Sequence, residues 1–177
     1  MTEKEKMLAG ELYDASDAEL VQARRHARAL LRAYTDGDDR ATLEELLGHV
    51  GKDAFVQPPF ACDYGYNISL GERSFVNFNG VFLDCAEIAI GDRVEIGPNV
   101  QLLTADHPRD IESRRRRLEF AKPITIEDDV WLGGGVIVLP GHTVGSGSIV
   151  GAGSVVTKDV PRGVVAAGNP CRVIRPL

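Results

Sequence analysis

His107 is the histidine of this sequence best placed to act as a general base. Of the other three, His26 and His49 lie in segments with helical spacing and His142 lies at a corner of a six-residue repeat, so structural roles explain them. His107 follows two polar residues and precedes a proline, which stiffens the backbone. An imidazole titrates near neutral pH and can take the proton of a hydroxyl that attacks a carbonyl, which accelerates such reactions by about 10²- to 10⁴-fold.

The three cysteines and a run of four arginines are weaker candidates. Cys62, Cys85 and Cys171 form no CxxC pair and have no histidine close in sequence to activate a thiolate, so packing roles are favoured. We expect a cytoplasmic protein, because these cysteines suggest no disulfide framework and the charged first residues lack the apolar stretch of a signal peptide. The run Arg114 to Arg117 looks like a phosphate clamp, but a solvated loop face or a contact with a neighbouring subunit is favoured.

A six-residue apolar period begins near Phe55. Its clearest stretch places an aliphatic residue at every sixth position from Ile126 to Val156, and an earlier stretch runs from Ile90 to Leu102. A third run, Leu70 to Ile88, ends two residues before the second begins, which predicts a small insertion or an irregular corner. The period fits neither a helix nor simple strand alternation. It predicts stacked coils in which six residues form one short strand and a turn.

A polar insertion interrupts the coils between about residues 103 and 123. It is highly charged and begins with Asp106, His107 and Pro108. Long excursions from a regular solenoid are usually functional or disordered. His107 should therefore be held at the point where a rigid scaffold ends.

Two helices are predicted before the coils. Residues 16–35 have helical spacing and an apparent capping box of Ser16 and Glu19, and a second helix is predicted from Arg40 to Val50. We therefore expect a helical segment over 1–54 that packs on a β-helix over 55–177.

Together these features resemble a known family. The repeats, the loop opening with His-Pro, the stretch ITIEDDVWLGGGVIVLPG and the ending VVTKDVPRGVVAAGNPCRVIRPL are similar to the maltose, galactoside and nodulation O-acetyltransferases of the hexapeptide-repeat superfamily. The stretches EKEKMLAGELYDASDAEL and FACDYGYNISLG are most similar to the maltose branch. The resemblance implies a mainly β fold, a left-handed parallel β-helix of hexapeptide repeats with N-terminal α-helices and an extended loop. It also implies a homotrimer with active sites between subunits.

The resemblance further implies that acetyl-coenzyme A donates an acetyl group to a hydroxyl of a small sugar of the maltose or glucose type, with no acyl-enzyme and no metal. His107 matches the family's catalytic histidine, and Asn77 matches the asparagine beside it. Positions that match acceptor-binding groups are Asp63, Asp84, Arg24 and Asp14. Positions that match coenzyme A contacts are Trp131, Gly134, Ala152, Thr157, Lys158, Arg172 and Arg175.

The carboxyl-terminal stretch suits the phosphates of coenzyme A. Residues 157–177 carry four cations against the single acid Asp159, although the whole chain has a net charge of −6. Arginine binds phosphate through paired hydrogen bonds, and lysine binds it as a point charge. Within this stretch, Arg162 is better explained as a solvated surface cation.

Three alternatives stay open. An amine acceptor, such as an amino sugar or serine, would use the same donor machinery. A zinc hydratase of the γ-carbonic anhydrase type needs three histidine ligands, and only His107 and His142 lie outside the predicted helices. A non-catalytic repeat protein would leave the His-Pro loop and the basic end unexplained. The acidic net charge gives no reason to expect a nucleic acid partner.

Overall fold

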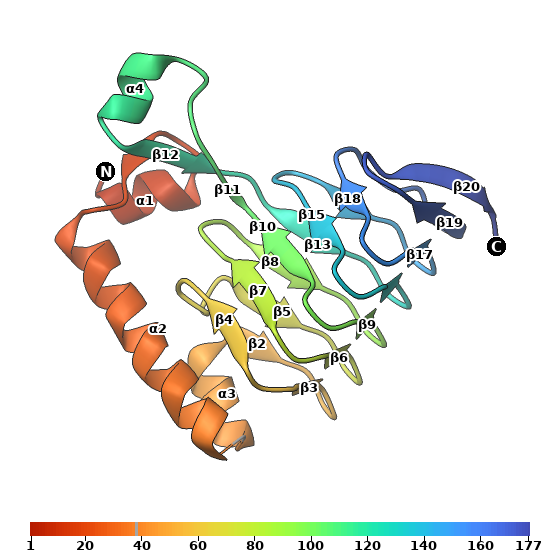
Figure 1. The fold of residues 1–177 in the computed structure, drawn as a ribbon. Helices are drawn as coiled ribbons and strands as arrows, with labels where there is room; N and C mark the ends of the chain where they lie inside the picture. Colours follow the sequence, from red (N-terminus) through yellow and green to blue (C-terminus); the bar gives the residue numbers. More distant parts are fainter. Residues whose placement is uncertain (38) are drawn as a thin grey trace.

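A computed structural model describes residues 1–37 and 39–177, and its centre is a parallel β-helix (Figure 1). The chain visits three sheets in turn. Sheet 1 contains β2 (His49–Val50), β5 (Ile68–Leu70), β8 (Ile88–Ile90), β13 (Ile124–Ile126) and β16 (Thr143–Val144). Sheet 2 contains β3 (Phe55–Val56), β6 (Phe75–Val76), β9 (Glu95–Ile96), β14 (Trp131–Leu132), β17 (Ile149–Val150), β19 (Val164–Ala167) and β20 (Arg172–Pro176). Sheet 3 contains β4 (Phe60–Cys62), β7 (Gly80–Leu83), β10 (Gln101–Leu103), β15 (Ile137–Val138) and β18 (Val155–Val156).

The structure confirms the predicted six-residue repeat, because the aliphatic residues of the repeat form the core of the coils. In sheet 1, Leu70, Ile90, Ile126 and Val144 are register partners in successive coils, and each is at most 4% exposed. Burial of each such side chain contributes roughly 1.5–3 kcal/mol relative to exposure. A single turn could not bury this face alone, so the coils stabilise one another.

The two runs that are out of phase meet in one strand. Both Ile88 and Ile90 are buried in β8, so each run supplies an inward residue to the same strand. Register partners Leu70 and Ile90 are 20 residues apart in sequence, whereas Ile126 and Val144 are 18 apart. The two additional residues lie in the corner between β7 and β8, where the sequence predicted an irregularity.

The helical segment differs from its prediction in two places. It comprises α1 (Glu3–Leu8), α2 (Ala18–Gly37) and α3 (Arg40–Leu46). The second helix was predicted to reach Val50 but ends at Leu46, because His49 and Val50 pair with β5 as the first strand of sheet 1. The coils therefore begin before residue 55.

The predicted capping box of Ser16 and Glu19 does not form. The Ser16 hydroxyl donates to Asp14 (2.6 Å), and the Glu19 N–H donates to Asp17 Oδ1 (3.0 Å) instead. A capping box is present on α1, where Thr2 and Glu5 exchange hydrogen bonds between side chain and backbone. Ser16 therefore does not accept the Glu19 N–H as a capping box requires, because the Asp17 carboxylate accepts it.

The insertion after β10 packs against the N-terminal helices (Figure 1). It contains β11 (Ala105–Asp106), α4 (Ile111–Arg115) and β12 (Leu118–Ala121), and β12 joins β11 to β1 (Tyr13–Asp14) in a small antiparallel sheet. A second core beneath this sheet contains Met7, Tyr13, Leu20, Tyr64, Cys85, Ala86 and Ala121. This core fixes the segment that carries His107 to both the helices and the coils.

Candidate active site

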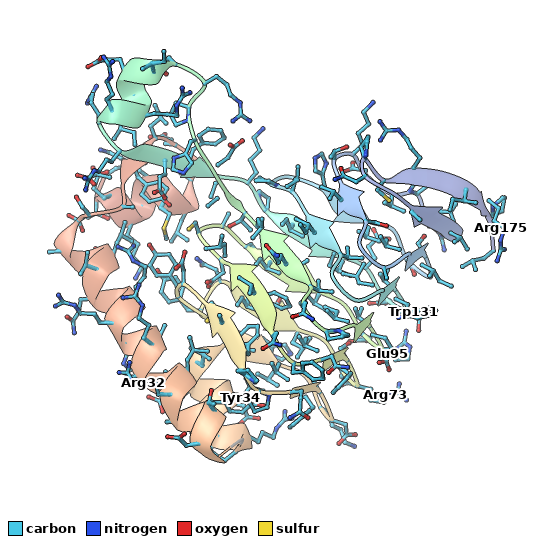
Figure 2. All side chains as sticks on the ribbon, in the orientation of Figure 1. Arg32, Tyr34, Arg73, Glu95, Trp131 and Arg175 are labelled. Atoms are coloured by element: carbon cyan, nitrogen blue, oxygen red, sulfur yellow. The ribbon has the colours of Figure 1, made fainter. Side chains whose placement is uncertain are left out.

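A groove of about 440 Å³ runs along the outer face of sheet 2. In each strand the residue before the buried one points outward, so Phe75, Glu95, Trp131 and Ile149 stack in register across four coils. Trp131 is 53% exposed, and exposed aromatic side chains of this size mark binding surfaces when they gather in a groove. Figure 2 shows Glu95 and Trp131 along the side of the solenoid that leads to Arg175.

Four of the predicted site residues line this one groove. They are Asn77, Trp131, Gly134 and Ala152. Sequence reasoning missed their neighbours Phe75, Glu95 and Ile149. The signal that would have found them is the six-residue register itself, since each precedes a buried aliphatic residue in the same way as Trp131 precedes Leu132.

Gly133 and Gly134, in the run of three glycines that follows Trp131 and Leu132, have different surroundings. A Cβ at Gly133 would lie 2.6 Å from the backbone nitrogen of Ala152, so close packing of two coils requires glycine there. The N–H groups of Gly133 and Gly135 donate to the carbonyl groups of Val150 and Pro98. Gly134 lines the groove, and its N–H has no acceptor within the described part of the chain.

The far end of the sheet carries cations. Lys158 and Arg172 line a second cavity of about 200 Å³, and Arg175 is the register partner of Val165 at the edge of sheet 2. Within residues 1–37 and 39–177, none of these three side chains forms an ion pair with a carboxylate. Thr157, which precedes Lys158, is half-buried. Asp159, the acid of this stretch, instead accepts the N–H of Thr143 (3.0 Å) and contacts His142 Nδ1 (3.2 Å). The hydrogen bond from Thr143 is the main cause that lowers the pKa of Asp159, and the contact with His142 lowers it further.

The predicted acceptor-binding residues lie at a different corner, between sheets 3 and 1. Arg24 donates to the Tyr64 hydroxyl and to the carbonyl of Ala15, both at 2.6 Å. Asp63 is partly buried, and its Oδ2 accepts the Cys85 thiol at 3.5 Å. Asp14 lies in β1 next to β12, and hydrogen bonds from Ser16 lower its pKa. These groups surround the second core.

Asp84 is fully buried rather than open to a ligand. Its Oδ1 accepts the backbone N–H groups of Asp63 (3.0 Å) and Tyr64 (2.8 Å), while its buried Oδ2 has no partner among the described residues. Burial raises the pKa of Asp84 to about 7. In this structure Asp84 therefore holds the backbone of the corner that carries Asp63, a role that residue type alone did not indicate.

His107 is exposed and belongs to the same side of the molecule as Asp63. It follows β11, and its neighbour Pro108 is buried. Asn77 lies at the other edge of sheet 3, between β6 and β7, and the four-residue strand β7 alone spans roughly 13 Å. Within one chain the structure does not bring Asn77 and His107 together.

The cysteines suit the packing roles expected of them. Burial raises the pKa of Cys85 to about 12 and raises that of Cys62 still further. Thiolates at these positions are strongly disfavoured, so neither cysteine has the electropositive surroundings of a nucleophile.

Residues 1–37 and 39–177 contain neither a cluster of metal ligands nor a membrane-spanning helix. No three His, Cys, Asp or Glu side chains gather in an arrangement that would hold a metal ion. No helix has the length and apolar character needed to cross a membrane.

The coils, the groove on sheet 2 and the cations near the carboxyl terminus are the features of a hexapeptide-repeat acyltransferase scaffold. The model of the maltose acetyltransferase hexapeptide capping motif matches residues 6–51, and the model of the bacterial transferase hexapeptide, with six repeats, matches residues 123–158. The chain belongs to the hexapeptide-repeat acetyltransferases.

Relatives and solved structures agree with this family over the whole chain. Nodulation protein L from Rhizobium meliloti is 51% identical over 178 residues, covering 97% of each chain. A maltose O-acetyltransferase from Clostridium difficile has a TM-score of 0.97 at 48% identity, covering 100% of this chain and 98% of that one. A hexapeptide-repeat acetyltransferase from Vibrio cholerae, solved with acetyl coenzyme A, has a TM-score of 0.93 at 44% identity, covering 100% and 99%.

Proposed function

We propose that this acetyltransferase moves an acetyl group from acetyl-coenzyme A to a hydroxyl of a small sugar of the maltose or glucose type, with His107 as general base. The observation that carries the proposal is a groove lined by Trp131 and Ala152 on sheet 2, the same sheet whose last strand carries Arg172 and Arg175. Coenzyme A, which has an apolar pantetheine arm with phosphates at one end, matches that arrangement. The relative from Vibrio cholerae, solved with acetyl coenzyme A, supports the same donor.

In the proposed reaction the acceptor oxygen forms a bond to the thioester carbonyl carbon while His107 removes the hydroxyl proton. The negative charge that develops on the carbonyl oxygen needs a hydrogen-bond donor, and the free N–H of Gly134 is the backbone candidate in the groove. Collapse of the intermediate breaks the carbon–sulfur bond. The imidazolium returns its proton to the leaving thiolate, giving an O-acetyl sugar and coenzyme A.

We further infer that the active site is completed between subunits of a homotrimer. The groove with Asn77 and the corner with His107 and Asp63 lie at different edges of sheet 3, so each chain holds two incomplete halves. Phe78, next to Asn77, is 44% exposed, which suits a surface covered by a neighbour. A cytoplasmic location stays the expectation from the cysteines.

The acceptor is tested by release of the coenzyme A thiol from acetyl-coenzyme A in the presence of glucose, maltose, galactosides, amino sugars or serine. We expect release with the neutral sugars and an O-acetyl product by mass spectrometry. Transfer only to an amine would support the alternative acceptor class. An absence of acceptor-dependent release would contradict the proposal.

His107→Ala should lower turnover by about 10²- to 10⁴-fold, because a general base is lost. The matched control is His26→Ala, an exposed histidine on α2 that should leave turnover unchanged. Both variants should retain the wild-type thermal unfolding midpoint. Wild-type turnover in His107→Ala would rule out this base.

A further inference from the structure

Arg114 turns back from α4 onto the segment that carries His107. Its Nη1 lies 3.0 Å from the carbonyl oxygen of Pro108 and 2.7 Å from that of Arg109. Arg115, the next residue of the arginine run, instead lies 3.8 Å from Glu112 within α4. The four arginines are therefore not one patch, because Arg114 has a specific backbone partner that Arg115 does not share.

The same turn is held on its other side by Asp106 and Arg109. The His107 N–H donates to Asp106 Oδ1 (2.8 Å), and Arg109 Nη1 donates to the His107 carbonyl (3.2 Å). Arg109 also binds both carboxylate oxygens of Asp106 at 3.0 Å. Arg109 is 83% exposed on its side chain, so this pair alone constrains the turn weakly.

The imidazole itself has no hydrogen-bond partner among the described residues. Its direction therefore depends on the backbone from Asp106 to Arg109 and on the buried ring of Pro108. The short helix α4 places Arg114 against this backbone, and Asp110 caps α4 by accepting the Ser113 N–H (2.8 Å). The helix and the cap are thus the elements that deliver the guanidinium to the turn.

We propose that Arg114 is a positioning residue for His107, acting through the carbonyl groups of Pro108 and Arg109. The inference rests on the proposed function, since it assumes that His107 is the base. A reacting group displaced by about 1 Å can lose about 10²-fold in rate. Loss of the Arg114 contacts should therefore reduce the chemical step and spare donor binding.

The test is a double-mutant cycle of wild type, Arg114→Ala, His107→Ala and the double variant, followed by thiol release at saturating acetyl-coenzyme A and sugar. We expect Arg114→Ala to lower kcat by roughly 10- to 100-fold, with the KM for acetyl-coenzyme A changed by less than about twofold. In the His107→Ala background the same substitution should change the residual rate by less than about twofold, because a residue that acts through His107 has nothing left to position.

The matched control is Arg115→Ala, which removes an equal charge from the same helix and should behave as wild type. Arg114→Lys keeps the positive charge and a donor group on a shorter reach, and should retain part of the rate. It also serves if Arg114→Ala fails to fold, as judged by the unfolding midpoint and the size of the assembly. A loss of equal size on replacing Arg114 in the wild-type and in the His107→Ala backgrounds would overturn the inference.

The role of His107 as general base and the role of Arg114 as its positioning residue would be contradicted by different results. If His107→Ala is inactive while Arg114→Ala matches Arg115→Ala, only the positioning role is lost. If His107→Ala retains wild-type turnover, the proposed base is wrong and the positioning role is wrong with it. An equal drop on both sides of the cycle would show that Arg114 acts on another group.

Discussion

At the residue scale, Arg172 is the cation best placed to bind a phosphate of the donor. It lines a cavity together with Lys158, and its Nη1 already donates to the carbonyl of Cys171 (2.7 Å), which orients the guanidinium. Arg162 belongs to the same basic stretch but does not line that cavity. The two arginines therefore form a matched pair in which only one is expected to touch the donor.

Arg172→Ala should raise the KM for acetyl-coenzyme A by about tenfold, because a hydrogen bond to a charged group contributes about 1.5–3 kcal/mol. The KM for sugar and kcat should change little. Arg162→Ala should leave all three constants unchanged. Steady-state kinetics with each substrate varied in turn measures these values, and an effect confined to the sugar would place Arg172 at the wrong end of the site.

Asp84 gives a residue-scale prediction about pH. Its pKa is raised in the folded protein from 3.8 to about 7 by burial. Because the pKa of Asp84 is higher in the folded than in the unfolded chain, its contribution to the free energy of unfolding is complete below about pH 4. That contribution is lost as the pH rises through 7. Wild type should therefore lose roughly 2 to 3 kcal/mol between pH 5 and pH 8 relative to Asp84→Asn, which cannot ionise.

The comparison uses urea unfolding of both proteins at one chain concentration, so that assembly contributes equally. Asp84→Asn retains an oxygen that can accept the N–H groups of Asp63 and Tyr64. Its absolute stability can differ from wild type at every pH, but its pH slope should be smaller. Parallel slopes for the two proteins would show that the carboxyl titrates normally.

At the element scale, the spacing between coils depends on glycines whose missing side chains let backbones approach. A Cβ at Gly145 would lie 2.5 Å from the nitrogen of Arg162 and 2.8 Å from the carbonyl carbon of Pro161. Gly147, in the same corner, has a φ of +70° and open space around it. One glycine is needed for packing and the other for its backbone conformation.

This difference predicts unequal costs for the same substitution. Gly145→Ala should reduce the free energy of unfolding by about 3 kcal/mol, because the next coil must move away. Gly147→Ala should reduce it by only about 1 kcal/mol, the cost of a left-handed alanine. Chemical denaturation of both variants provides the measurement, and equal losses would contradict the packing argument.

The coils could be predicted from sequence because their period is carried by aliphatic residues such as Leu132 and Val150, whose side chains are fully buried. The end of α3 and the capping of α2 could not be predicted from the sequence. His49 and Val50 continue a helical pattern, yet pairing with β5 satisfies their backbone better. Ser16 has the right spacing for a cap, but the Asp17 carboxylate accepts the Glu19 N–H in its place. Local patterns fail where a tertiary partner offers a second solution.

At the scale of the whole molecule, the candidate site could be predicted only as a set of residues and not as one place. Motif similarity assigns Asn77 and His107 to the same site, but sequence does not state which chain supplies each. The structure puts them at two edges of sheet 3, with the groove on one side and the loop on the other. A closed ring of subunits with head-to-tail interfaces would join each loop to a neighbour's groove.

Subunit mixing tests this arrangement directly. His107→Ala chains and Asn77→Ala chains should each form weakly active assemblies, because each lacks one half of every site. After joint unfolding and refolding at equal amounts, about a quarter of the sites in random rings should combine an intact His107 with an intact Asn77 from its neighbour. Turnover of the mixture should then rise to about a quarter of wild type, well above the mean of the two parents.

The control is the same mixture prepared without unfolding, which should keep the mean of the parental rates because no subunits exchange. If both residues of a site came from one chain, every site in the mixed rings would still carry one defect. Refolding would then produce no gain in turnover. A rate that stays at the parental mean after exchange, with mixed rings verified by native mass spectrometry, would show that His107 and Asn77 do not act across a subunit boundary.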